Sequence, residues 1–244
     1  MSRPLIVIPA RLASTRLPNK PLALLGGKPM IVHVWQCAVE ADIGDVIVAC
    51  CGPEIADVVK NAGGNAVITD PSHPSGTDRI KEALQDRLIS DDTIIVNLQG
   101  DLPTISKAAL RAVLAPLENS AVDIGTLAAP MTALDQIENP NIVKVAIAFE
   151  TPDMGRALYF SRAPIPYGSG TFYHHIGIYA YRGSAFKRYV SLKPSPLEKT
   201  ESLEQLRALE DGMRIDVKMI SEAPHTVDTQ KDLDSVIRFL GSKQ

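Results

Sequence analysis

Short runs of apolar residues alternate with segments of helical periodicity along the first half of the chain. Strands of a parallel sheet that is covered on both faces are nearly all apolar. Runs of this kind occur at Leu5–Ile8, Asp45–Cys50, Asn65–Thr69 and Thr93–Asn97. Because strands that alternate with helices are typical of βαβ units, the pattern predicts an α/β fold around a mostly parallel sheet.

Helices are predicted between these strands. Apolar residues recur at helical spacing from Met30 to Ala41. A second helix spans the stretch from Pro53 to the glycine pair at 63–64, since proline favours the start of a helix and glycine the position after its end. The polar stretch Ser75–Asp78 begins a third helix, and a fourth spans about residues 106–118.

The pattern changes in the second half, where strand-like runs from Asp123 to Tyr181 show little helical periodicity. We interpret residues 130–195 as added strands and an arm. No linker rich in Pro, Ser or Gly separates two domains, so we predict a single domain over residues 1–244. The further predicted elements are strands at Ile124–Ala128, Ile142–Ala148, His175–Tyr181 and Arg214–Ile220, and helices at Leu197–Leu209 and Gln230–Leu240.

The composition is that of an ordinary globular protein, with 45% hydrophobic and 22% charged residues. A net charge of -3 gives no general attraction to nucleic acid. The first apolar run is too short for a signal peptide, and no run reaches the roughly 18 residues of a membrane span. We therefore expect a cytoplasmic protein without membrane insertion. Cys37, Cys50 and Cys51 lack metal-binding spacing and are expected to be buried free thiols.

A basic loop follows the first predicted strand. Its cations and hydroxyl residues are Arg11, Ser14, Thr15, Arg16 and Lys20. Such groups bind phosphate oxygens, and ligands of open α/β sheets lie beyond the carboxyl ends of the strands. The loop is therefore a candidate phosphate site, although an ordinary solvated loop would show the same charges. Neither a Walker loop nor a G-x-G-x-x-G motif occurs, which weakens ATPase and dinucleotide-binding interpretations.

Two aspartates are candidates for a metal site. Asp101 follows the strand Thr93–Asn97, at the same edge of the sheet as the basic loop. Mg²⁺ usually takes one or two carboxylates together with substrate phosphates, and Asp228 is the second candidate. By pattern alone, a helix cap is the better explanation for Asp228 and also for Ser75–Arg79. Arg162 is a natural partner for a substrate carboxylate.

Motifs in a consistent order along the chain carry a resemblance to one enzyme family. They are Ile8–Arg11, Ser14–Pro18, Lys20–Leu22, Gly27–Ile31, Ser75–Arg79, Val96–Asp101, Asn139–Asn141, Val143–Val145, Ala157–Arg162, His175–Tyr179, Pro194–Glu198, Leu203–Arg207 and Val227–Thr229. Over nearly its whole length the chain closely resembles the CMP-Kdo synthetases. These cytidylyltransferases make CMP-3-deoxy-manno-octulosonate in Gram-negative lipopolysaccharide synthesis.

The resemblance implies a three-layer, Rossmann-like nucleotidyltransferase fold with a mostly parallel mixed sheet, and a homodimer formed through the arm. It implies Mg²⁺-dependent transfer of CMP from CTP to 3-deoxy-manno-octulosonate (Kdo), with release of pyrophosphate. Asp101 and Asp228 would hold Mg²⁺, and Arg11, Lys20 and Asp101 would be catalytic. The nucleotide would be bound by Ala10, Arg11, Ser14, Thr15, Arg16, Lys20, Ser75, Gly76 and Arg79. The sugar acid would be bound by Gln99, Arg162, His175, Tyr179, Glu204 and Gln205.

Two positions depart from the family pattern. Cys51 stands where the aspartate of Ala-Thr-Asp is expected, and Leu102 where the glutamate of Gln-Gly-Asp-Glu-Pro is expected. The absence of two acidic side chains leaves two alternatives open. One is a cytidylyltransferase for a related sugar acid, such as 8-amino-Kdo or a sialic-type acid. The other is a catalytically silent paralogue that binds nucleotide, which the retention of Asp101 and Asp228 disfavours.

Overall fold

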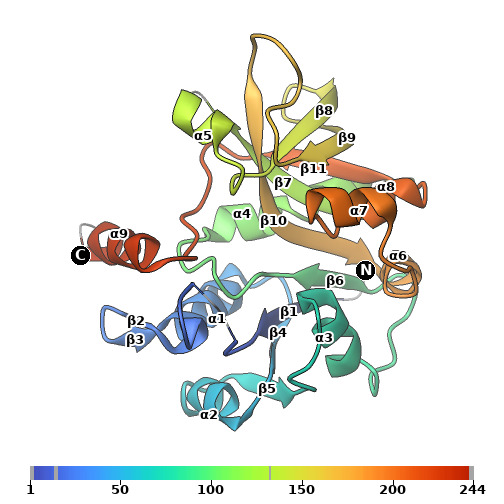
Figure 1. Cartoon of the computed structure of the whole chain (residues 1–244). Coiled ribbons are helices and arrows are strands. Elements are labelled where there is room, and N and C mark those ends of the chain that lie inside the picture. The colour runs from blue at the N-terminus through green and yellow to red at the C-terminus, as the bar shows by residue number, and fades with distance from the viewer. Residues whose placement is uncertain (1–2, 14–15, 132, 242–244) are drawn as a thin grey trace. The chain divides into compact units, whose positions relative to one another are not determined.

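The chain divides into two compact units in the structure, which is a computed structural model (Figure 1). The structure describes residues 3–13, 16–131 and 133–241. One unit comprises Met1–Leu110 with Pro224–Gln244, and the other comprises Arg111–Ala223. The single domain over residues 1–244 stays a prediction. No helix among the described residues is long and apolar enough to cross a membrane.

Parallel strands form the sheet of the first unit. Their order is β5 (Asn65–Ile68), β4 (Asp45–Cys50), β1 (Leu5–Ala10) and β6 (Ile94–Asn97). The register of β1 and β4 runs from Leu5 opposite Asp45 to Ala10 opposite Cys50. Every residue of β1 is buried, as expected for a central strand of a parallel sheet. The predicted α/β class is confirmed, and these strands begin and end within two residues of their predicted bounds.

Helices and a small hairpin complete the first unit. The helices are α1 (Met30–Ala41), α2 (Pro53–Asn61), α3 (Gly76–Ala83), α9 (Gln230–Gly241) and the 3-10 helix η1 (Lys20–Leu22). The hairpin pairs β2 (Leu24–Leu25) with β3 (Lys28–Pro29). Its turn residues Gly26 and Gly27 have φ of 57° and 83°, a left-handed backbone that glycine adopts without steric cost.

The second unit contains a mixed sheet. Its strand order is β10 (Phe172–Arg182), β7 (Ile124–Met131), β11 (Ile215–Met219), β9 (Met154–Ser161) and β8 (Lys144–Thr151). β7 and β11 are parallel, and the other neighbours are antiparallel. A pairing of Lys144 with His174 also joins β8 to β10, so the two ends of the order meet.

Short helices flank these strands or lie at the boundary of the unit. They are α4 (Lys107–Ala112), the 3-10 helix η2 (Ala115–Glu118), α5 (Leu134–Glu138), α6 (Gly183–Tyr189), α7 (Pro196–Glu201) and α8 (Leu206–Glu210).

Three of the differences from the sequence prediction have a local cause. The helix predicted over 106–118 is divided into α4 and η2, with Pro116, which lacks an N–H, inside the second piece. The helix predicted over 197–209 is divided at Ser202, whose left-handed backbone ends α7. β9 was not predicted, because Leu158 places an apolar side chain at an exposed position and obscures the strand alternation.

Candidate functional site

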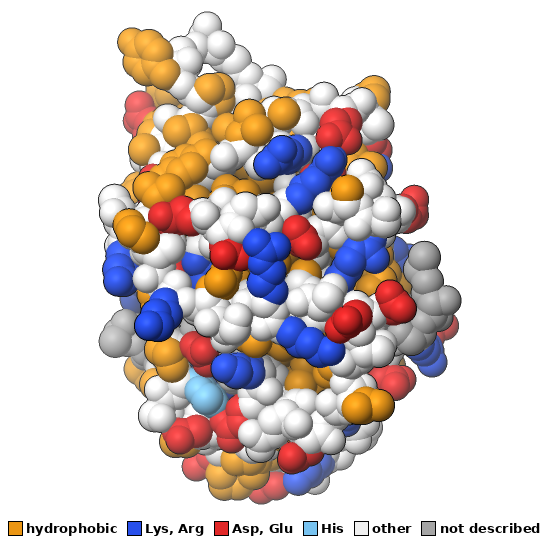
Figure 2. Space-filling view, turned by 90° about the vertical axis from the view of Figure 1, so that its right-hand side faces the viewer, with side chains coloured by type: hydrophobic (Ala, Val, Ile, Leu, Met, Phe, Trp, Pro, Cys, Tyr) orange, Lys and Arg blue, Asp and Glu red, His pale blue; other side chains and the backbone are white. Residues whose placement is uncertain are grey.

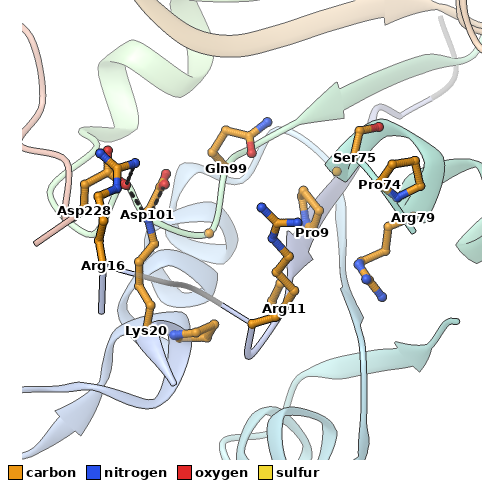
Figure 3. Close-up of a pocket in the computed structure, with 15 residues that line it drawn as sticks. Pro9, Arg11, Arg16, Lys20, Pro74, Ser75, Arg79, Gln99, Asp101 and Asp228 are labelled. Carbon is orange, nitrogen blue, oxygen red and sulfur yellow. Dashed lines mark hydrogen bonds and ion pairs between the residues drawn. The ribbon is translucent and has the colours of Figure 1, made fainter. Parts of the chain in front are cut away.

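A cavity of about 710 Å³ lies in the first unit beyond the carboxyl ends of β1 and β6 (Figure 3). Its charged lining residues are Arg11, Arg16, Lys20, Arg79, Asp101 and Asp228. The other lining residues are Pro9, Ala10, Ala13, Pro21, Pro74, Ser75, Gly76, Gln99 and Gly100. Cations outnumber carboxylates in this lining, so the cavity suits a polyanion. Predicted residues Ser14 and Thr15 lie outside the described part of the chain.

Lys20 joins the two aspartates that were predicted as metal ligands. Its Nζ donates hydrogen bonds to Asp101 Oδ2 and Asp228 Oδ1, each at 2.8 Å. Nη2 of Arg16 lies 3.5 Å from the same oxygen of Asp228. Burial opposes the charge of Lys20, but Asp101 and Asp228 outweigh it, and the net effect raises the pKa of the ammonium group. Lys20 therefore remains a cation at neutral pH.

Backbone and core contacts hold these side chains together. Lys20 begins η1, directly after Asn19 in a left-handed conformation. The N–H of Val227 donates to the carbonyl of Asp101 at 3.1 Å, which links the segments that carry the two carboxylates. Val227 is also fully buried in an apolar cluster with residues of the basic loop, the hairpin, α1 and α9. The adjacent Asp228 is thereby fixed beside the loop.

The cap of α9 is formed by Thr229 and not by Asp228. Thr229 Oγ1 accepts a hydrogen bond from the N–H of Asp232 and donates to Oδ2 of Asp232. That oxygen also accepts from the N–H groups of Asp228 and Thr229. The carboxylate of Asp228 is therefore turned to Lys20, and the helix-cap interpretation of Asp228 is wrong.

Ser75 caps a helix and also faces the cavity. It is the N-cap of α3, where its Oγ accepts from the N–H of Asp78 at 3.1 Å, and it also lines the cavity. Gly76 follows it, and a Cβ there would lie 3.1 Å from the ring of Pro9, so the backbone approaches β1 closely.

Arg79 is a buried cation on the wall of the cavity, with 2% of its surface exposed. Nη1 donates to Oγ1 of Thr69, which in turn donates to the carbonyl of Cys50. Among the described residues, Nη2 of Arg79 is the buried side-chain atom without a hydrogen-bond partner. A buried donor without a partner is costly, and Thr69 meets only part of the hydrogen-bonding capacity of this guanidinium group.

The two departures from the family pattern lie in different surroundings. Cys51 is partly exposed, and its Sγ accepts a hydrogen bond at 3.3 Å from the N–H of Leu12 in the basic loop. Leu102 is 2% exposed and belongs to the core. Of the predicted buried thiols, Cys50 is buried, whereas Cys37 and Cys51 are half-buried.

The residues predicted for the sugar acid are divided between the units. Gln99 lines the cavity of the first unit, where its amide nitrogen donates to Oδ1 of Asn97 at 3.0 Å. The second unit carries Arg162, His175, Tyr179, Glu204 and Gln205.

Arg162 binds backbone carbonyls in this structure. Nε donates to Glu201 at 2.8 Å, Nη1 to Pro140 at 3.0 Å and Nη2 to Ser202 at 3.2 Å. A guanidinium group has five N–H bonds, so these three contacts leave part of its donor capacity for a ligand. Its backbone N–H also donates to the carboxylate of Glu201, which accepts from Ser161 Oγ as well.

An aromatic and imidazole cluster surrounds the next two predicted residues. The ring of His175 lies 4.7 Å from that of Phe160 in edge-to-face contact and 5.6 Å from that of Tyr179. Burial, and to a lesser degree His174, lowers the pKa of His175 to about 3. Burial, and then Glu204, raises the pKa of Tyr179. Both side chains are therefore neutral near pH 7, so they offer hydrogen bonding and shape rather than charge.

Lys144 is a buried cation that the residue patterns did not single out. It is fully buried, and its Nζ donates to the carbonyls of Asn139, Ile142 and Arg162 at 2.8, 2.8 and 2.6 Å. Burial, followed by the nearby charge of Arg162, lowers its pKa. The sequence signal was a lysine inside the predicted apolar strand Ile142–Ala148, where a charge requires buried partners.

Comparisons with known proteins agree with this α/β nucleotidyltransferase architecture. A cytidylyltransferase family model matches residues 5–215. The 3-deoxy-manno-octulosonate cytidylyltransferase of Rhodopseudomonas palustris (strain BisB5) is 55% identical, with 97% of each chain covered. The enzyme of that name from Nitrobacter hamburgensis is 54% identical, covering 99% of this chain and 94% of the relative. The chain therefore belongs to the cytidylyltransferase family, and the family resemblance seen in the sequence is confirmed.

One solved structure agrees with this family assignment, and a second shares the fold. A CMP:2-keto-3-deoxy-manno-octonic acid synthetase complexed with CTP matches with a TM-score of 0.91 and 37% identity, over 100% of both chains. A nucleotidyl transferase from Methanothermobacter matches with a TM-score of 0.64 at 15% identity, which shows a shared fold alone.

Proposed function

We propose that this chain transfers CMP from CTP to Kdo and releases pyrophosphate. The observation that carries the proposal is the convergence of Lys20, Asp101 and Asp228 in a cavity that Arg11 and Arg16 also line. Cations near a carboxylate pair suit the binding of a triphosphate with its metal ion. The relatives named for Kdo cytidylyl transfer, and the similar synthetase that is complexed with CTP, support these two substrates.

The carboxylates fit a Mg²⁺ ion. Asp101 and Asp228 each contact the same ammonium nitrogen at 2.8 Å, so the two carboxylates lie close together. They are 31% and 38% exposed, which leaves them accessible to a metal that arrives with a nucleotide. Mg²⁺ commonly takes two carboxylates and completes its shell with phosphate oxygens and water. When bound, it would neutralise phosphate charge and polarise the α-phosphate.

The residues of the chain contribute position and charge. In the transfer, the anomeric oxygen of Kdo forms a bond to the α-phosphorus, the bond to pyrophosphate breaks, and the hydroxyl proton passes to Asp101, Asp228 or water. Arg11, Arg16 and Lys20 balance the charge that grows on departing pyrophosphate. Ser75, Gly76 and Arg79, which all line the cavity, border the nucleoside. Such electrostatic positioning is the main requirement of this kind of reaction.

Pyrophosphate release tests this proposal. The purified protein is incubated with CTP, Mg²⁺ and Kdo, with each omitted in turn, and with 8-amino-Kdo or a sialic acid in place of Kdo. We expect release that requires all three components and is fastest with Kdo. Release only with another sugar acid would identify the related cytidylyltransferase. CTP binding without release from any acid would identify the silent paralogue.

Two variants connect the reaction to the cavity. Lys20→Met and Asp101→Asn are expected to lower the rate by at least about 100-fold, the scale observed when a group that stabilises a transition state is removed. Lys107→Met is the matched control, because Lys107 is an exposed lysine paired with Glu40 outside the cavity. Rates of both cavity variants close to that of Lys107→Met would refute the proposed roles.

The proposal includes a cytoplasmic homodimer formed through residues 130–195. Figure 2 shows apolar side chains gathered at the upper end of the face in view. In the second unit, Leu134 and Leu158 are 68% and 59% exposed, and exposed apolar surface is typical of interfaces. Light scattering is expected to give twice the mass of one chain, and Leu158→Glu to give a monomer. A monomeric parent protein would refute the dimer.

A further inference from the structure

A bulge in β10 brings a buried hydroxyl group against His175. Strand β10 pairs with β7 as far as Ile176, and pairing resumes with Tyr179 opposite Thr126, so two residues of β10 have no partner on β7. Thr126 is fully buried at this point. Its Oγ1 lies 2.8 Å from the carbonyl oxygen of Ile178, 3.2 Å from that of Ile176 and 3.0 Å from Nε2 of His175.

The single proton of the Thr126 hydroxyl decides how these contacts are shared. Carbonyl oxygens only accept hydrogen bonds, so a bond to Ile178 or Ile176 requires the Thr126 proton. If that proton pointed to His175 instead, both carbonyls of the bulge would lose this donor. If it points to Ile178, the hydroxyl oxygen still accepts a bond from a protonated Nε2. The second arrangement makes two hydrogen bonds where the first makes one, and buried polar groups strongly favour it.

Because Nε2 then carries the ring proton, Nδ1 of His175 is left as a hydrogen-bond acceptor. A neutral imidazole carries one ring proton, and burial keeps this ring neutral. Within the described residues, no hydrogen bond reaches Nδ1 of His175. If this nitrogen were sealed from solvent it would be a buried atom without a partner, but among the described residues that atom is Nη2 of Arg79. Nδ1 therefore keeps access to solvent. Its ring is held from the sides by Phe160 and Tyr179.

We infer that Thr126 is a positioning residue that holds His175 protonated on Nε2, so that Nδ1 accepts a hydrogen bond from a hydroxyl of the bound sugar acid. The substrate part of this inference rests on the proposed function, which supplies a polyhydroxylated ligand. An acceptor at Nδ1 binds a hydroxyl but not a carboxylate, since a carboxylate has no proton to donate. Thr126 would thus help to orient the sugar acid without touching it.

Nitrogen-15 NMR of the histidine rings tests the proton position without any activity measurement. The His175 signals are assigned by their loss in His175→Gln. In the parent protein and in Thr126→Ser, which keeps the hydroxyl, we expect protonated Nε2 and unprotonated Nδ1. In Thr126→Val, which keeps the shape, we expect a mixture of the two neutral forms. A proton on Nδ1 in the parent protein, or an unchanged proton position in Thr126→Val, would overturn the inference. If Thr126→Val does not fold, the parent spectrum still decides the proton position.

Kinetics test the role of that nitrogen in binding. In Thr126→Val the KM for Kdo is expected to rise about tenfold, the scale of one hydrogen bond, while the KM for CTP is unchanged. Thr126→Ser should restore the parent value. An unchanged KM for Kdo, or an equal rise for both substrates, would overturn the positioning role. A parent protein that releases no pyrophosphate with Kdo would refute the proposed function, whereas the NMR result would still decide between the two forms of His175.

Discussion

Replacement of Lys20 by methionine measures the electrostatic balance of the cavity directly. The ammonium group lies 2.8 Å from Asp101 and from Asp228, and a hydrogen bond to a charged group contributes about 1.5–3 kcal/mol. Asp228 is 38% exposed, so solvent screening reduces its share. We expect Lys20→Met to lower the free energy of unfolding at pH 7 by about 2 kcal/mol, mainly through the bond to Asp101.

The effect of Lys20 has a defined pH dependence. Burial lowers its pKa, but the two aspartates raise it further, so the folded-state pKa lies above 10.5. A cation whose pKa is raised by folding stabilises the protein fully below its unfolded-state pKa, and this stability is lost as the pH rises through the folded-state pKa. The stability gap between the parent and Lys20→Met should therefore be constant from pH 7 to about 9 and narrow above 10.5.

Urea unfolding followed by circular dichroism at pH 7, 9 and 11 provides the measurement. Lys107→Met is the control, because an exposed ion pair contributes about 0–1 kcal/mol. Mg²⁺ should recover part of the stability of Lys20→Met, since the two carboxylates then lack their ammonium partner. A Lys20→Met protein as stable as the parent at pH 7, or a gap that widens above pH 10.5, would refute the reasoning.

Three further predictions concern the walls of the cavity. Arg79→Gln is expected to weaken CTP binding about tenfold in calorimetry, because a cation on the wall of the cavity is lost; unchanged affinity would show that this cation does not contribute to CTP binding. A thiol reagent that labels Cys51 should inactivate the protein, and CTP should protect it, because Cys51 Sγ contacts the N–H of Leu12; full activity after confirmed labelling would contradict this. Thr229→Ala should lower the free energy of unfolding by about 1 kcal/mol and raise the KM for CTP, since the cap that orients Asp228 is removed; an unchanged KM would show that the cap does not influence CTP binding.

The first unit was predictable because its strands β1, β4 and β6 are buried on both faces. In β1 and β4 an apolar run alone defines the strand, and the ends of β1 and β6 then place Arg11 and Asp101 at one edge of the sheet. The position of Asp228 was not derivable in this way. It depends on Val227, which packs against residues far away in the sequence.

In the second unit, residue patterns did not predict the partners of several polar side chains. Arg162 was expected from its charge to meet a substrate carboxylate, but its partners include three backbone carbonyls. Lys144 and Thr126 are likewise bound to carbonyls. Every residue has a carbonyl, so sequence patterns do not indicate which carbonyls such a side chain contacts. The bulge that brings Thr126 to His175 is also a matter of strand register, which one sequence does not specify.

The absence of two expected acidic side chains does not remove the cation position. Leu102 directly follows Asp101, whose carboxylate contacts Lys20, yet it is packed in the core, so this residue is accommodated by apolar packing. Cys51 contacts the backbone of the basic loop, so its thiol serves as the acceptor for a loop N–H. A thiol is a weaker acceptor than a carboxylate. The substitution at 51 therefore acts on how firmly the loop with Arg11 is held, whereas the oxygens that would bind Mg²⁺ come from Asp101 and Asp228, which both remain.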